Sequence, residues 1–126
     1  MEKAMKKVLI VEDDKDFLWL LRQSFGNQKF SVIFAEDGEQ GLEMAEKEKP
    51  DLMVIDIMLP KMSGIDMAKK VKEKGIKTMM IFLTNLKDPE HVSKALEAAG
   101  ESDYIVKADV RLESIVDRVK SKLGIK

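Results

Sequence analysis

The chain has 126 residues, and its 22 basic and 23 acidic side chains give a formal net charge of -1. This length suits about one domain with a substantial core, and the balanced charge excludes a general electrostatic attraction to nucleic acid or to a membrane surface. There is no cysteine, which excludes disulfides and thiol chemistry, and no apolar run approaches the roughly 20 residues of a membrane span. We therefore expect a single soluble cytoplasmic domain over residues 1–126, with no output domain.

The first half of the chain alternates short apolar runs with segments of helical periodicity. The pattern predicts strands over residues 8–11, 31–35 and 52–57, each bounded by polar or turn-forming residues. Two helices are predicted between these strands. Asp14 or a neighbouring carboxylate can cap the first helix, and Asp37 opens the second.

The second half continues the same alternation. Ser63 is placed to cap a third helix that Gly75 closes, and Asp88 with Pro89 is typical of a cap followed by the first residue of a fourth helix. The remaining predicted elements are strands over residues 79–83 and 104–106 and a last helix over roughly 110–123. Strand and helix thus alternate five times, which predicts an α/β domain with a parallel sheet.

Four of the predicted strands end in polar groups that could carry chemistry. The clearest is Asp56, because an ionisable carboxylate after an apolar strand must be solvated, paired or bound to a metal. The other three ends carry Glu12 with Asp13, then Thr84, then Lys107. Since the carboxyl ends of parallel strands share one edge of a sheet, we expect these groups to meet there. Carboxylates, a hydroxyl and an ammonium together suit a divalent cation and a phosphoryl group.

Four separated motifs in this order resemble the receiver domain of two-component response regulators. They lie at residues 8–14, at 51–64 around Asp56, at 82–84 and at 103–107. The resemblance covers nearly the whole chain. It implies a flavodoxin-like fold, a doubly wound (βα)5 sandwich whose five-stranded parallel sheet has the strand order 2-1-3-4-5.

The resemblance also implies a phosphoryl switch that depends on Mg²⁺. Asp56 matches the phosphoacceptor, and Asp13 matches the acid that binds the ion directly together with Asp56. The backbone carbonyl of Met58 would add a further ligand, and Glu12 would act on the ion through water. A cation is needed because these carboxylates would otherwise repel an incoming phosphate.

Three more positions match residues that respond to the phosphoryl group. Thr84 corresponds to the hydroxyl that moves to the new phosphate, and Lys107 to the ammonium that pairs with another phosphate oxygen. Tyr104 occupies the aromatic switch position, where a half-buried packing role is the alternative. Two residues depart from the usual pattern: Ala108 replaces a proline after the lysine, which predicts a trans peptide, and Asn85 replaces an alanine after the hydroxyl.

The implied partners are a sensor histidine kinase or a histidine phosphotransfer protein, and a downstream protein target, with no direct contact to nucleic acid or membrane. We expect the signal to leave through the fourth and last helices and the strand between them. The chain would then be a signalling receiver, not an enzyme, that catalyses only its own phosphotransfer and autodephosphorylation. The alternatives are a haloacid-dehalogenase-like phosphatase, which would have a second aspartate in place of Met58, and a receiver-fold scaffold that is not phosphorylated.

Two further expectations concern individual side chains. The phosphorylated state should be long-lived, because Met58 and Leu86 cannot position a hydrolytic water as polar residues could. The lone histidine, His91, is expected to be a solvated residue in the first turn of its helix.

Overall fold

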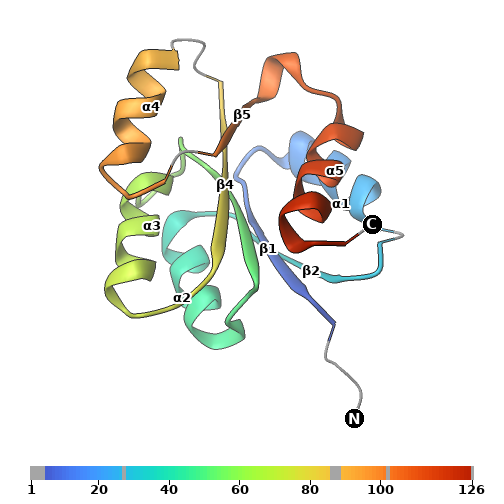
Figure 1. The fold of residues 1–126 in the computed structure, drawn as a ribbon, viewed down its shortest axis with the longest axis horizontal. Coiled ribbons are helices and arrows are strands. Elements are labelled where there is room, and N and C mark those ends of the chain that lie inside the picture. The colour runs from blue at the N-terminus through green and yellow to red at the C-terminus, as the bar shows by residue number, and fades with distance from the viewer. Residues whose placement is uncertain (1–4, 27, 86–88, 102, 126) are drawn as a thin grey trace.

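Strands and helices alternate along the chain in the computed structural model, which describes residues 5–26, 28–85, 89–101 and 103–125 (Figure 1). The strands are β1 (Lys7–Val11), β2 (Ser31–Ala35), β3 (Leu52–Asp56), β4 (Met79–Thr84) and β5 (Tyr104–Val106). The helices are α1 (Lys15–Phe25), α2 (Gly38–Glu48), α3 (Gly64–Glu73), α4 (Pro89–Glu97) and α5 (Leu112–Leu123), and a 3-10 turn, η1 (Lys107–Asp109), follows β5. None of the helices in these ranges is long and apolar enough to cross a membrane.

The strands form one parallel sheet in the order β2-β1-β3-β4-β5, as predicted. Figure 1 shows α1 and α5 on one face of the sheet and α2, α3 and α4 on the other. This is the flavodoxin-like doubly wound fold. The strand order reverses between β1 and β3, and the carboxyl ends of strands at such a reversal are where open α/β sheets bind ligands.

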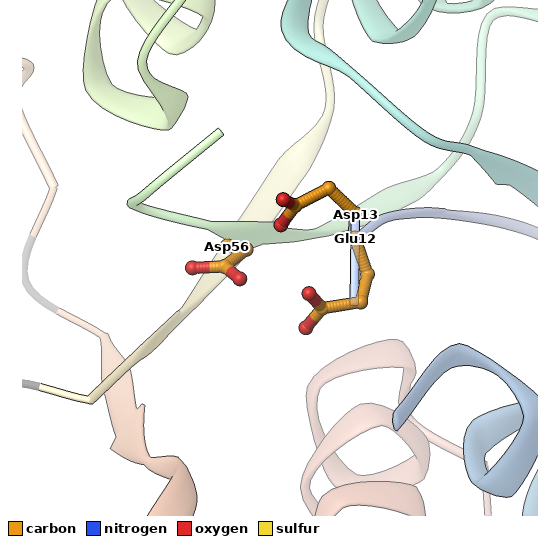
Figure 2. Close-up of side chains that lie close together, drawn as sticks. All are labelled: Glu12, Asp13 and Asp56. Carbon is orange, nitrogen blue, oxygen red and sulfur yellow. The ribbon is translucent and has the colours of Figure 1, made fainter. Parts of the chain in front are cut away.

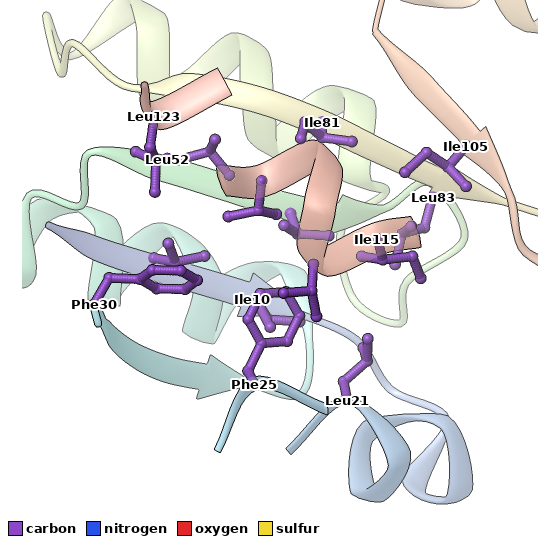
Figure 3. Close-up of a cluster of buried hydrophobic side chains, with 14 residues drawn as sticks. Ile10, Leu21, Phe25, Phe30, Leu52, Ile81, Leu83, Ile105, Ile115 and Leu123 are labelled. Atoms are coloured by element: carbon purple, nitrogen blue, oxygen red, sulfur yellow. The ribbon is translucent and has the colours of Figure 1, made fainter. Parts of the chain in front are cut away.

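Two apolar cores, one on each face, hold the sheet and helices together. Val8 and Ile10 of β1 pack on the face covered by α1 and α5 (Figure 3), whereas Leu9 and Val11 pack on the opposite face. The alternation follows from the two-residue period of a strand. Because both faces are covered, the central strands are almost continuously apolar until they reach the edge where their polar groups lie.

Helix caps appear where the sequence predicts them. Asp14, Asp37 and Ser63 each accept hydrogen bonds from backbone N–H groups in the first turns of α1, α2 and α3. A cap of this kind contributes about 1 kcal/mol. Pro89 is the first residue of α4, as predicted, whereas the predicted cap Asp88 lies outside the described residues.

The last helix begins two residues later than predicted. The peptide after Lys107 is trans and lies within η1, and Val110 is then extended, with φ -115° and ψ 146°. Val110 packs against the same core as α5. Its apolar side chain therefore fits the helical spacing of the sequence although its backbone is not helical. The strand prediction also ran one residue too far at β3, which ends at Asp56.

Candidate functional site

Three carboxylates gather at the carboxyl ends of β1 and β3. Glu12 and Asp13 follow β1 directly, and Asp56 is the last residue of β3. Figure 2 shows their side chains pointing toward a common space, and one oxygen from each lies within 4.8 Å of the others. Glu12 and Asp56 are buried and Asp13 is exposed, so the cluster is open to solvent on the side of Asp13.

Lys107 supplies the positive charge that these carboxylates contact. Its Nζ donates to Glu12 Oε1 at 2.8 Å and to Asp56 Oδ2 at 3.2 Å. The lysine side chain is only 8% exposed, so both ion pairs are shielded from water. The ammonium therefore reaches the site although Ala108, and not proline, follows it.

Backbone N–H groups hold the two buried carboxylates from the loops that follow each strand. The amide of Met58 donates to Asp56 Oδ1 at 3.0 Å, and the amide of Asp14 donates to Glu12 Oε2 at 3.0 Å. Each carboxylate thus has one oxygen on a backbone amide and the other on Lys107. Met58, two residues after Asp56, is 65% exposed.

The crowded charges shift the pKa values of two side chains in the site. The pKa of Glu12 is raised from 4.5 to about 7, first because the carboxyl is buried and then because Asp56 lies beside it. Burial alone would lower the pKa of Lys107, but its contacts with Glu12 and Asp56 outweigh burial and raise it. Among the described residues Lys107 is the one cation that contacts the cluster, which leaves an excess of negative charge.

Thr84 and Tyr104 lie on the strands next to Asp56. Asp56 pairs in register with Leu83, so Thr84 ends β4 at the same edge of the sheet, where it is fully buried. Tyr104 begins β5 opposite Phe82 and is half-buried against the core on the α2, α3 and α4 side. Asn85 is exposed, whereas Leu86 lies outside the described residues, as does the side chain of His91.

One glycine lets the next helix approach the site closely. A Cβ on Gly64, the first residue of α3, would lie 2.2 Å from the carbonyl oxygen of Asp56 and 2.8 Å from a methyl group of Ile55. Such distances are impossible, so only glycine fits at this position. The N-terminus of α3 thereby supports the backbone that carries Asp56.

Sequence reasoning missed one residue of the site. Phe17, an apolar residue whose spacing suits the buried face of the first helix, has its ring centroid 4.5 Å from Lys107 Nζ. Its place in the first turn of α1 was the available signal, because a helix that follows β1 starts at the same edge of the sheet as Glu12 and Asp13.

Comparison with known proteins agrees with this fold. The model of the response regulator receiver domain matches residues 8–120. The alkaline phosphatase synthesis transcriptional regulatory protein PhoP of Bacillus subtilis is 38% identical over 102 residues, which are 81% of this chain and 42% of that protein. The chain spans half or less of the length of the first curated relatives it matches.

Solved structures give the same result. The BeF3-activated DrrB receiver domain has a TM-score of 0.82 and 35% identity, over 96% of this chain and 99% of that chain. A chain of the CheX-CheY-BeF3-Mg²⁺ complex from Borrelia burgdorferi has a TM-score of 0.82 and 28% identity, over 98% of this chain and 92% of that chain. The fold and these matches define a receiver domain of two-component signalling. The chain belongs to the response regulator receiver domain family, and this membership removes the basis for the haloacid-dehalogenase alternative.

Proposed function

We propose that this chain is a phosphorylation-dependent switch in which Asp56 accepts a phosphoryl group from the phosphohistidine of a sensor kinase or a phosphotransfer protein. The observation that carries the proposal is a buried carboxylate at the end of the central strand, beside two further acids and a lysine. In the transfer, an Asp56 oxygen bonds to phosphorus as the bond from phosphorus to histidine nitrogen breaks. The electron pair of that bond stays on the imidazole, which leaves as a neutral group when its second nitrogen carries a proton and otherwise takes a proton from water.

We infer that the acidic cluster holds Mg²⁺. The donors fit this ion, because Asp13, Asp56 and the backbone carbonyl of Met58 offer oxygen ligands, and Glu12 would act through a bound water. When bound, the ion supplies the positive charge that lets an anionic phosphoryl group approach carboxylates. The raised pKa of Glu12 supports this inference, since buried and uncompensated negative charge favours a cation.

Two side chains are proposed to bind oxygens of the phosphoryl group once it is on Asp56. Lys107 already contacts an Asp56 oxygen and would pair with a phosphate oxygen through a charge-assisted hydrogen bond. Thr84 would donate its hydroxyl to a second phosphate oxygen. Tyr104, on the adjacent strand, would change its packing in response, as a shift between two populations.

The output is proposed to be a change in the surface formed by α4, β5 and α5, which would bind a downstream protein. Relatives of the receiver carry names as different as transcriptional regulatory protein and cyclic di-GMP phosphodiesterase, so similarity in this domain does not identify the target. We propose that residues 1–126 act as one receiver domain in this switch.

Intact-mass measurement after incubation with acetyl phosphate and Mg²⁺ tests the proposal. We expect one added phosphoryl group on the parent and none on Asp56→Asn. Asp51→Asn is a matched control, because Asp51 flanks the other end of β3, and it should be labelled like the parent. A phosphoryl group that persists on the Asp56→Asn variant would contradict the assignment.

A further inference from the structure

The ammonium of Lys107 has a third neighbour besides its two carboxylates. The ring centroid of Phe17 lies 4.5 Å from Nζ. A cation within about 6 Å of a ring face is attracted by the negative potential of that face, and the attraction grows when water is excluded. Because the lysine side chain is only 8% exposed, water is largely excluded from this contact.

The segment that runs from the end of β1 into the first turn of α1 presents both a carboxylate and the ring to Lys107. The amide of Asp14 donates to Glu12 at 3.0 Å, and the side chain of Asp14 in turn accepts the amide of Phe17 at 3.2 Å. Phe17 is also partly buried against the core on the α1 and α5 face. The ring is therefore held in place by a capped helix turn and by packing.

On the other side of the contact, the backbone that carries Lys107 has fewer constraints. In the described part of the chain, no side chain caps the start of η1, because the preceding residue is Val106. Ala108 does not restrict the backbone angle φ as proline would. A lysine side chain has four carbons with many rotamers. Side-chain contacts at the ammonium must therefore select the rotamer that reaches Asp56.

We propose that Phe17 is a positioning residue for phosphoryl transfer, whose ring face holds the ammonium of Lys107 beside Asp56. This inference rests on the proposed function, to which it adds a role for Phe17. Without the ring, the ammonium spends less time where a phosphate oxygen will need it. Loss of the ring should not weaken Mg²⁺ binding, because the ammonium repels a second cation at the same carboxylates.

Three variants separate the ring face from ordinary packing. Phe17→Leu keeps an apolar side chain and removes the ring, whereas Phe17→Tyr keeps the ring. Phe34→Leu is a matched control, because the ring of Phe34 also lies 4.5 Å from a cation, Arg22, and is partly buried against the same core.

We expect Phe17→Leu to slow phosphorylation by acetyl phosphate, and to weaken beryllofluoride binding, by roughly three- to thirtyfold. Its affinity for Mg²⁺ alone should be equal to that of the parent or higher. Phe17→Tyr should restore phosphorylation to within about twofold of the parent, since tyrosine keeps the ring face. Phe34→Leu should match the parent in all three measurements.

The NMR signals of the Lys107 side chain give a readout that needs no phosphorylation. In metal-free protein the ring current of Phe17 should shift the ε-methylene resonances upfield. This shift should disappear in Phe17→Leu and persist in Phe17→Tyr and Phe34→Leu.

Two results would overturn the inference. One is a Phe17→Leu variant with the parental phosphorylation rate or unchanged Lys107 resonances. The other is a parallel loss of Mg²⁺ and beryllofluoride affinity, which indicates a general structural role. Failure of the proposed function looks different: the parent itself would gain no mass from acetyl phosphate. The role of Phe17 in transfer would then fall with it, although the Lys107 resonances would still report the ring contact.

Discussion

At the level of single residues, the proposed function needs crowded negative charge, whereas removing that charge should stabilise the fold. Two of the three carboxylates are buried, and one lysine is shared between them. Active sites commonly give up stability in this way. Substitutions of individual acids should therefore change stability and ligand binding in opposite directions.

Asp13→Ala separates these two effects. Removing one like charge should stabilise the metal-free protein by about 1 kcal/mol, because Asp13 is exposed and has no ion pair among the described contacts that would be lost. The same change should abolish stabilisation by Mg²⁺. Thermal melts with and without Mg²⁺ measure both effects, with Asp117→Ala, an exposed acid on α5, as control. A variant that Mg²⁺ stabilises as much as the parent would show that Asp13 is not a direct ligand.

Glu12 should make the metal-free protein less stable as pH rises. Its pKa is about 7 in the folded protein against an ordinary 4.5, so between these values the folded state holds a proton that the unfolded state has released. Stability from this group is present below pH 4.5, falls as pH rises toward 7 and then levels off. Urea unfolding in EDTA should show Glu12→Gln gaining stability relative to the parent across this range. A constant difference between the two proteins at every pH would refute the raised pKa.

Met58 is expected to slow loss of the phosphoryl group from Asp56. Its exposed thioether cannot orient a water molecule, whereas an asparagine could, so Met58→Asn should shorten a lifetime of many minutes. Met5→Asn is a matched control, since the two methionines are 62% and 65% exposed. Phosphoryl loss followed by mass in Mg²⁺ tests this, and equal decay in parent and Met58→Asn would contradict it. The second position in this expectation, Leu86, lies outside the described residues.

At the scale of elements, the site depends on how helix starts meet strand ends. The caps Asp14 and Ser63 start α1 and α3 immediately beside the ends of β1 and β3. At the far end of α3, Lys72 donates to the carbonyl oxygen of Ala99 at 2.7 Å and pairs with Glu101, which ties α3 to the segment between α4 and β5. The helices thus fix the loops that carry the acids.

Gly64→Ala tests the close contact between α3 and β3. Alanine favours a helix over glycine by about 1 kcal/mol, but its Cβ would overlap the carbonyl oxygen of Asp56 at 2.2 Å. We expect the clash to dominate and to destabilise the protein by about 2 kcal/mol or more in urea unfolding. Gly26→Ala is the control, because its Cβ would come no closer than 3.4 Å to its neighbours and its backbone is right-handed, so stability should hold or rise. Equal stability of both variants would contradict the packing described.

At the scale of the whole molecule, the fold and most of the site could be predicted because local signals agreed with topology. Apolar runs predict strands, and in a parallel sheet the carboxyl ends of all strands share one edge. This topology brings Glu12, Asp13 and Asp56 together even if the exact last residue of each strand is not known. The start of α5 and the role of Phe17 could not be predicted in this way. Val110 and Phe17 are apolar residues whose period suits a helix face, and only their three-dimensional contacts distinguish core packing from a contact with Lys107.

Phosphorylation of Asp56 is tested most directly by locating the phosphoryl group along the whole chain. Borohydride reduces an aspartyl phosphate to homoserine and a glutamyl phosphate to the longer hydroxynorvaline, so peptide mass spectrometry can locate the phosphoryl group among the 23 acidic residues without any prior choice of site. After treatment with acetyl phosphate and Mg²⁺, we predict homoserine at position 56 and at no other position. A reduced side chain at another acid, or no homoserine in protein that has gained the mass of a phosphoryl group, would contradict phosphorylation of Asp56.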